Sequence, residues 1–245
     1  ANATVVATTI FGAGPDGEED MVSPSCSTIG EMIGDGARDL ALKIARTIRK
    51  AGFQAYLVGG CVRDMILNRT PKDFDIATDA IPGDILRLFP GAILVGAQFG
   101  VVLVRENGVQ VEIATFRSDF AYEDGRRPRQ VAFENDPKQD VLRRDFTINA
   151  LLYDIENDTV IDFVNGKRDV FEGIVRAIGD PERRFGEDHL RMLRAVRFAA
   201  RLGFSIEPGT MAAIQKLHAS IGRVSAERVR DELTRILTEG GARRG

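Results

Sequence analysis

Two aspartates separated by a single residue have the clearest potential for chemistry in this sequence. Asp73 and Asp75 flank Phe74 in the segment KDFDIATD, where residues 74–77 have the composition of a short strand. Side chains alternate between the two faces of a strand, so both carboxylates point to one side while Phe74 and Ile76 point toward a core. Two neighbouring carboxylates repel each other unless a divalent cation lies between them, and Mg²⁺ with bound phosphates is the usual solution. The spacing therefore indicates a metal site.

A pair of glycines precedes the aspartates and could bind an anion. The sequence predicts a strand over 55–58, a turn at Gly59 and Gly60, and a helix that opens at 61–64. Because glycine has no Cβ atom, the backbone can approach a ligand and present N–H groups at the start of a helix, with Arg63 one turn in. A triphosphate at the glycines and a metal at the aspartates would be neighbours. The alternative is an ordinary strand–turn–helix followed by a solvated acidic strand end, and these residues alone are compatible with both.

A third carboxylate comes from a predicted β-hairpin. Two apolar segments flank Asn107 and Gly108, which is a strong signal for a two-residue hairpin turn. In the second arm Val111 and Ile113 share one face, which leaves Glu112 in mid-strand on the less apolar face. Glu112 is therefore a candidate partner of the two aspartates. An exposed strand glutamate fits the same pattern equally well.

Size and composition exclude several classes of protein. The chain has 245 residues, 44% hydrophobic and 28% charged, which is typical of a full globular domain plus part of another. No segment approaches the roughly 18 apolar residues that a membrane-spanning helix needs. Cys26 and Cys61 lie far apart, and the two histidines are too few for a histidine-based metal site. Neither a disulfide framework nor a zinc site is expected, which suits the reducing cytoplasm.

Charge divides the sequence into three parts. Residues 1–35 carry six acidic and no basic residues and have no sustained period, so we expect a poorly ordered extension. Residues 36–180 contain the candidate site and are nearly balanced, with 20 basic and 22 acidic residues. Residues 181–245 carry 13 basic and 8 acidic residues, so a polyanion would be attracted to this part of the chain.

Further elements must position these side chains. The pattern predicts a helix over 37–52, a short helix over 82–88, a strand over 159–164 and a turn at Asn165 and Gly166. Residues 118–140 are charged and contain two prolines, which indicates a long surface loop with at most a brief strand at 131–133. The segment RRDFTINALLYD, residues 143–154, predicts a helix capped by Asp145 or Thr147, with Arg143 and Arg144 at its start.

Charged residues recur at every third position in the helical segment PERRFGEDHLRMLRAVRFAARLGF, at Asp188, Arg191, Arg194 and Arg197. Asp188 and Arg191 are i, i+3 neighbours on a continuous helix. Asp188 accepts hydrogen bonds and Arg191 donates them, so together they could match the polar edge of an amino base, C or A. A surface ladder of ion pairs is the alternative. His189 is expected at the helix surface rather than in catalysis.

Six segments occur in a characteristic order: GGCVRD, DFDIAT, VEIATFR, RRDFTINAL, GEDHLRMLRAVRFAARLGF and SAERVRDEL. This series resembles the bacterial-type (class II) tRNA nucleotidyltransferases and the related bacterial poly(A) polymerases, from about residue 37 to about residue 237. The resemblance implies an α+β fold, in which a polymerase-β-like nucleotidyltransferase palm with a mixed sheet and flanking helices, over 36–180, precedes an all-helical neck over 181–245. Such relatives continue into further helical domains that hold tRNA, so this sequence resembles their head and neck.

The resemblance also implies a reaction and a role for each candidate residue. Nucleoside monophosphates from CTP or ATP would be transferred to an RNA 3′ end without a template, by two-metal phosphoryl transfer with Mg²⁺. The metal ions would be bound by Asp73 and Asp75, with Glu112 as the third catalytic acid. The nucleotide would be bound by a larger set: Gly59, Gly60, Arg63, Arg144, Asp188, Arg191, Arg194 and Arg197, of which Asp188 and Arg191 would contact the base.

Within this family the sequence favours CCA addition to tRNA. A full-length 118–140 segment with YEDGRRP resembles CCA-adding rather than CC-adding enzymes, whereas LLYDIENDTVIDFVNG resembles the poly(A) polymerases. Poly(A) or A-only addition from ATP is therefore the alternative function. A non-catalytic protein that binds nucleotide or RNA as a regulator is a further alternative. The presence of both Asp73 and Asp75 argues against it.

Overall fold

The computed structural model describes residues 35–95, 99–122 and 128–239. The N-terminal extension expected over 1–35 thus lies outside the described residues, except for Asp35. No helix in the described ranges combines the length and the apolar character that crossing a membrane requires.

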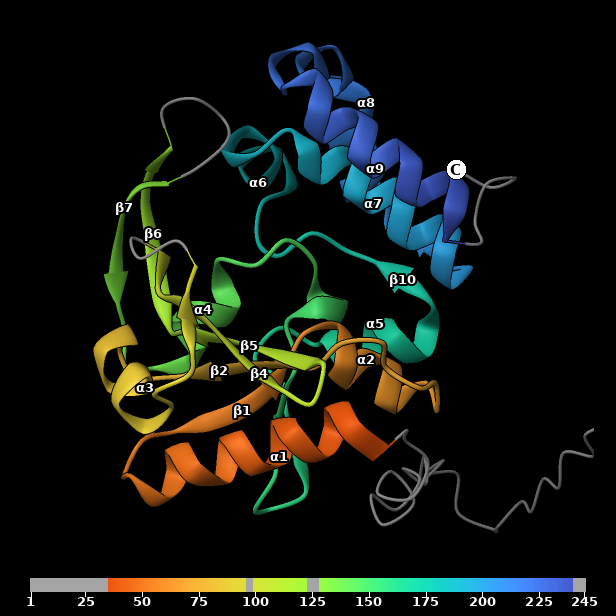
Figure 1. Cartoon of the computed structure of the whole chain (residues 1–245). Coiled ribbons are helices and arrows are strands. Elements are labelled where there is room, and N and C mark those ends of the chain that lie inside the picture. Colours follow the sequence, from red (N-terminus) through yellow and green to blue (C-terminus); the bar gives the residue numbers. More distant parts are fainter. Residues whose placement is uncertain (1–34, 96–98, 123–127, 240–245) are drawn as a thin grey trace, which may run out of the picture.

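A seven-stranded mixed sheet forms the centre of the N-terminal part (Figure 1). Its strand order is β3-β4-β5-β2-β1-β8-β9. Among the described strand pairs of this sheet, β2 and β5 alone run parallel, and the others are antiparallel. The strands are β1 (Ala55–Val58), β2 (Asp75–Thr78), β3 (Ile93–Leu94), β4 (Val101–Glu106), β5 (Val109–Thr115), β8 (Leu152–Asp154) and β9 (Thr159–Ile161).

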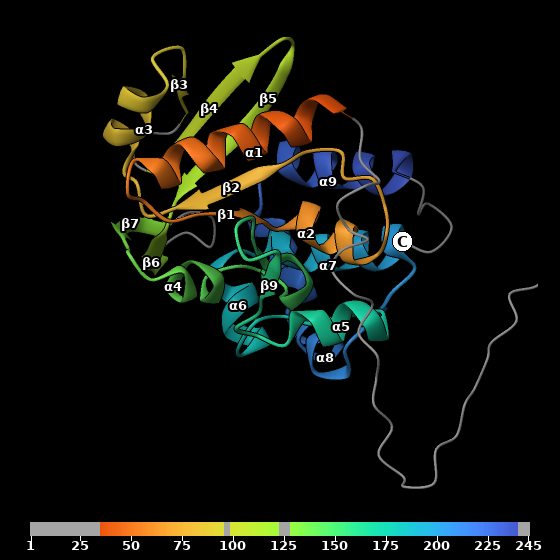
Figure 2. The ribbon, with the colours of Figure 1, turned by 90° about the horizontal axis from the view of Figure 1, so that it is seen from below.

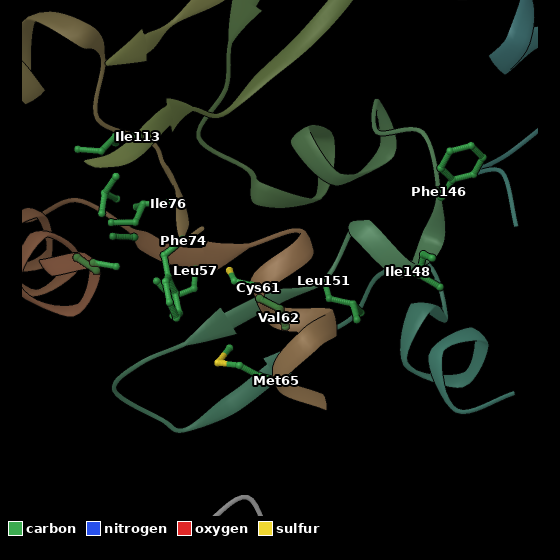
Figure 3. Packing of buried hydrophobic residues seen from close by; sticks show 14 of the residues in the cluster. Leu57, Cys61, Val62, Met65, Phe74, Ile76, Ile113, Phe146, Ile148 and Leu151 are labelled. Carbon is green, nitrogen blue, oxygen red and sulfur yellow. The ribbon is translucent and has the colours of Figure 1, made fainter. Parts of the chain in front are cut away.

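Helix α1 (Asp35–Lys50) covers one face of this sheet (Figure 2). Its apolar side, with Ile44 and Ile48, belongs to the same buried cluster as residues from β1, β2 and β5. Figure 3 shows Phe74 and Ile76 beside Ile113 in that cluster, close to helix α2 (Gly60–Ile66). The alternation predicted around the aspartates is therefore confirmed, because Phe74 and Ile76 are buried.

One predicted turn and one predicted short helix are formed as expected. Asn107 and Gly108 both have positive φ angles, 51° and 78°, and connect β4 to β5 as a two-residue hairpin with Glu106 opposite Val109. This is the geometry that an Asn-Gly pair favours. The short helix over 82–88 is also confirmed as α3 (Pro82–Leu88).

The prediction of a long loop over 118–140 is wrong. Strands β6 (Arg117–Tyr122) and β7 (Pro128–Phe133) pair as an antiparallel hairpin, and α4 (Pro137–Leu142) follows; residues 123–127 lie outside the described residues. The brief strand expected at 131–133 is the end of β7. Helix α4 begins where Asp136 accepts the backbone N–H of Lys138 and Pro137 takes the first position. The charged composition of residues 118–140 favoured a loop prediction, although the segment contains strands and a helix with a favourable Asp-Pro start.

The prediction of a helix over 143–154 is also wrong. This segment contains one short turn, η3 (Thr147–Asn149), and then β8, while Arg143 and Arg144 follow α4 instead of starting a helix. Asp145 accepts the N–H of Phe146 at 2.9 Å and caps no helix. Pairing of β8 with both β1 and β9 satisfies the backbone there, and this tertiary pairing overrides the local preference.

The C-terminal part is predominantly helical and lies on the opposite side of the sheet from α1 (Figure 1). Its helices are α6 (Pro181–Glu187), α7 (Leu190–Leu202), α8 (Pro208–Leu217), η4 (His218–Arg223) and α9 (Ala226–Thr238). One short strand, β11 (Ser205–Ile206), pairs parallel with β10 (Ile174–Val175). His189 lies before α7 and is buried, so the prediction that it occupies the helix surface is wrong.

We expect Gly166→Ala to destabilise the fold. Gly166 begins α5 (Gly166–Glu172), and an added Cβ atom would lie 2.2 Å from the backbone carbonyl oxygen of Thr147. Because no side-chain rotation can relieve a clash with backbone, the free energy of unfolding should fall by about 2–3 kcal/mol in urea denaturation. Gly186→Ala in α6 is the control, since its added Cβ meets nothing within 4 Å and should change stability by at most about 1 kcal/mol. Equal losses for the two variants would contradict this account.

Candidate active site

The parallel pairing of β2 with β5 brings two acidic side chains together. Asp75 is the register partner of Glu112, so their side chains project from the same face of the sheet. The adjacent partners Ile76 and Ile113 are fully buried on the other face. Glu112 therefore lies beside Asp75, although its side chain is exposed, as the alternative of an exposed strand glutamate also expects. Its catalytic role stays a prediction.

A cavity of about 330 Å³ borders the aspartates. Of the candidate residues, it brings together Gly60, Arg63, Asp73, Asp75 and Arg197. The remaining lining residues are Cys61, Asp64, Lys72, Arg201, Arg235 and Glu239. The cavity thus lies between the N-terminal sheet with its α2 turn and the C-terminal helices α7 and α9, although these segments are more than a hundred residues apart.

The carboxylates experience one another's charge. Burial raises the pKa of Asp75 to about 6, and the charges of Glu112 and Asp73 add to the effect while that of Arg144 opposes it. Partial desolvation likewise raises the pKa of Glu112, against the opposing charges of Arg117 and Arg144. A bound cation would relieve this repulsion.

The donor set fits Mg²⁺ that is shared with a ligand. Within the described ranges, no cluster of three or more His, Cys, Asp or Glu side chains forms a ready metal cage. Mg²⁺ does not require one, because it is usually held by one or two carboxylates together with substrate phosphates and water. Asp73 and Asp75 line the cavity, and neither carboxylate has a hydrogen-bond or ion-pair partner among the residues that the structure describes.

The glycine turn allows close approach to the site. Gly59 has a φ angle of 83°, a conformation that favours glycine, and a Cβ atom there would lie 3.6 Å from a guanidinium nitrogen of Arg144. Arg144 is held by Asp140 at 2.9 Å. The structure therefore places the Arg144 charge beside Gly59, where the sequence had suggested a nucleotide contact.

Arg63 is more constrained than the sequence suggested. Its guanidinium is buried, pairs with Asp64 at 2.7 Å and donates to Asn149 at 2.5 Å. It also lies over the ring of Phe198 in α7. Arg63 lines the cavity, but these contacts show that it also joins α2 to η3 and α7.

Arg194 and Arg197 form a charged connection between the two parts of the chain. Arg194 binds Asp145 at 2.7 Å, and Arg197 binds Glu232 of α9 at 2.6 Å. Glu232 lies 3.6 Å from Arg194 as well, so a single carboxylate connects both arginines. Arg197 lines the cavity, whereas Arg194 is not among its lining residues.

The pairing predicted for Asp188 with Arg191 is not formed. Asp188 lies at the break between α6 and α7, with extended backbone, and its carboxylate binds Arg228 at 2.8 Å. Arg191 instead binds Glu187 at 2.6 Å. The helix is interrupted between Glu187 and Leu190. The backbone N–H of Arg191 still donates to the carbonyl oxygen of Asp188 at 3.0 Å, but the two side chains bind different partners. Their role in base recognition stays a prediction.

Three basic residues of the cavity were missed by sequence reasoning: Lys72, Arg201 and Arg235. Arg201 follows Arg197 by four residues on α7, a spacing that places two side chains on the same helix face. That spacing could have identified Arg201. Arg235 lies on a different helix, and no local pattern connects it to the cavity.

A mixed sheet with paired carboxylates beside a glycine turn, followed by basic helices, defines a nucleotidyltransferase palm with a helical neck. In agreement, residues 55–176 match the head domain of the poly(A) polymerase family. Residues 203–245 match a probable RNA- and SrmB-binding site of polymerase A.

Curated relatives and solved structures agree with this class. The CCA-adding enzyme of Limosilactobacillus fermentum is 46% identical over 197 residues, which cover 80% of this chain and 49% of that enzyme. The CCA-adding enzyme of Bacillus stearothermophilus in complex with CTP has a TM-score of 0.75 and 39% identity over 83% of this chain and 49% of that one. The Thermotoga maritima CCA-adding enzyme complexed with tRNA has a TM-score of 0.71 and 28% identity over 87% of this chain and 50% of that one.

The chain belongs to the family of bacterial CCA-adding enzymes and poly(A) polymerases. It spans about half the length of the curated relatives it matches.

We expect Asp145→Asn to weaken the connection between the sheet and α7. Although burial alone would raise it, Arg194 and Arg191 hold the pKa of Asp145 below its ordinary value. The variant should lower the free energy of unfolding at pH 7 by about 1–2 kcal/mol, because a partly buried ion pair is broken. This difference should be complete above the ordinary carboxylate pKa of about 3.9 and shrink as the pH falls through the lower pKa of the folded protein.

Urea denaturation of both proteins between pH 2.5 and pH 7 measures this difference. Asp231→Asn on α9 is the matched control, because Asp231 is exposed and its effect should stay within about 0.5 kcal/mol. A pH-independent loss in Asp145→Asn would contradict an electrostatic role.

Proposed function

We propose that this protein is a template-independent nucleotidyltransferase that adds CMP and AMP, from CTP and ATP, to the 3′ end of tRNA. The observation that carries the proposal is the register of Asp75 with Glu112 at the border of a cavity lined by Gly60 and several arginines. The relatives that the chain matches are CCA-adding enzymes, and solved neighbours of the fold were observed with CTP, ATP or tRNA.

In this proposal the acidic residues prepare the phosphoryl transfer. Asp73 and Asp75 would hold Mg²⁺, which when bound lowers the pKa of the RNA 3′-hydroxyl and stabilises charge on the triphosphate. Glu112 adds negative charge beside Asp75 and so favours the cation. Gly60 lets the triphosphate approach the backbone, and Arg144, beside Gly59, supplies positive charge.

Asp188 and Arg191 would select the base. The carboxylate of Asp188 can accept from the exocyclic amine of C or A, and the guanidinium of Arg191 can donate to a ring acceptor. In the structure both side chains have protein partners, Arg228 and Glu187. Base binding would therefore require each side chain to exchange its protein partner for the base. A base with the wrong polar edge would leave a partly buried charge without a partner, which is unfavourable.

Poly(A) or A-only addition is the second candidate, and the match to a poly(A) polymerase head domain favours it. The discriminating experiment incubates the chain with Mg²⁺, CTP, ATP and a tRNA that lacks its terminal CCA, followed by sequencing of the product 3′ ends. Addition of C, C and A supports the proposal, and long A tracts support the second candidate. Nucleotide binding without incorporation by the full-length protein supports a regulator.

We expect Asp75→Asn to abolish nucleotide transfer while the fold persists. The loss should be on the order of a thousandfold, because metal-assisted stabilisation of the transition state contributes several kcal/mol. Glu106→Gln is the control on β4 of the same sheet. Glu106 is exposed, pairs with Lys43 at 2.8 Å and does not line the cavity. Transfer rates under single-turnover conditions measure the effect. Activity of Asp75→Asn within a few fold of wild type would rule out the metal assignment.

We expect Arg191→Ala to relax the choice of base more than it weakens nucleotide affinity. The preference for CTP over UTP should fall about tenfold, the value of one good donor–acceptor contact. The control is Arg183→Ala, since Arg183 lies on the neighbouring helix α6, is mostly exposed and approaches the same Glu187 at 3.7 Å. Competition between labelled CTP and UTP provides the ratio. An equal decrease in the use of all four nucleotides would show that Arg191 has no role in base selection.

A further inference from the structure

Two cations that border the candidate site have no partner among the residues that the structure describes. Lys72 precedes Asp73 in the chain, and Arg235 projects from α9; both line the same cavity as the aspartates. Both are exposed. Across residues 35–95, 99–122 and 128–239, neither side chain has a hydrogen bond or an ion pair.

The other charges of the cavity are already compensated. Arg63 pairs with Asp64 at 2.7 Å. Arg201 lies 3.3 Å from Glu239, which is also 3.6 Å from Arg197. Two cations, Lys72 and Arg235, and two carboxylates, those of Asp73 and Asp75, remain in the cavity. No described ion pair joins the cations to the carboxylates.

A ligand that matches both sets must carry charge of both signs. A chain of phosphates with a bound divalent cation does so, because the cation binds carboxylates and the phosphate oxygens bind guanidinium and ammonium groups. The cavity of about 330 Å³ has the liquid volume of about ten water molecules, which leaves room for a short polyphosphate. Neither a purely anionic nor a purely cationic ligand would satisfy the whole lining.

We propose that Arg235, together with Lys72 and the Glu239-held Arg201, forms a phosphate-binding wall opposite the aspartates. This inference rests on the proposed function, which it deepens by assigning residues of α9 and α7 to the phosphate tail of the incoming nucleotide. Arg235 is the most informative member, since it is exposed and its replacement removes no described side-chain contact. An RNA backbone phosphate offers the same chemistry, so the test separates the two sources.

The test compares wild type with Arg235→Gln by isothermal titration calorimetry with three Mg²⁺-containing probes: inorganic tripolyphosphate, CTP and CMP. Loss of one partly exposed charged contact should weaken tripolyphosphate and CTP binding about five- to tenfold. CMP binding should change less than twofold, because CMP lacks the terminal phosphates. Arg230→Gln is the matched control on α9, where the exposed Arg230 lies outside this cavity and 3.5 Å from Asp231. It should leave all three affinities unchanged.

Titration of a tRNA that lacks CCA distinguishes the source of the phosphate. Weaker binding of tripolyphosphate and CTP, with unchanged tRNA binding, supports the nucleotide tail. Weaker binding of tRNA, with unchanged binding of tripolyphosphate and CTP, would show that these cations bind phosphates of the RNA backbone and not of the nucleotide. Unchanged affinities for all probes, or absence of tripolyphosphate binding by wild type, would overturn the inference. The proposed function is judged separately, by the sequence of the product 3′ end.

Discussion

The parallel pairing of β2 with β5 is the constraint on which the candidate site depends. A parallel pair needs a crossover connection, and α3 with β3 and β4 supplies it between the two strands. The register then places Asp75 beside Glu112, while Ile76 and Ile113 hold that register from the buried face. A slip of one residue would turn a carboxylate into the apolar core, so burial on one face positions the acids on the other.

A second constraint brings the basic helices to these acids. Asp145 binds Arg194, and Glu232 binds Arg197, so that α7 and α9 are tied to the segment before η3 and to each other. Phe198 of α7 meets Phe146 in an edge-to-face contact within the same region. These ion pairs help to fix the position of α7 and α9 relative to the sheet, so that segments distant in the chain contribute to one site.

Local patterns predicted the strand, glycine turn, aspartate alternation and Asn-Gly hairpin correctly, because each depends on neighbouring residues and on burial of one face. The errors concern residues whose partners the local pattern did not reveal. Residues 143–154 were predicted as a helix, yet β8 pairs with strands on both sides. Asp188 and Arg191 were assigned one continuous helix, yet the chain breaks at Asp188 and each side chain finds another partner. Pairing with distant segments determined the strand β8 and the partner of Asp188, whereas Arg191 binds a local partner, Glu187, one turn before it.

The sequence by itself determined the chemical groups of the site and their local presentation: two aspartates on one side of a core-facing phenylalanine, and glycines at a turn. Tertiary structure alone decided which distant charges face them. The cavity is lined by three basic residues that no single sequence pattern connects: Lys72, Arg201 and Arg235. Asp75 lies beside Glu112 only because β2 pairs with β5. The physical reason is that side-chain alternation is a property of the local backbone, whereas the juxtaposition of strands and helices follows from how the whole chain buries its apolar surface.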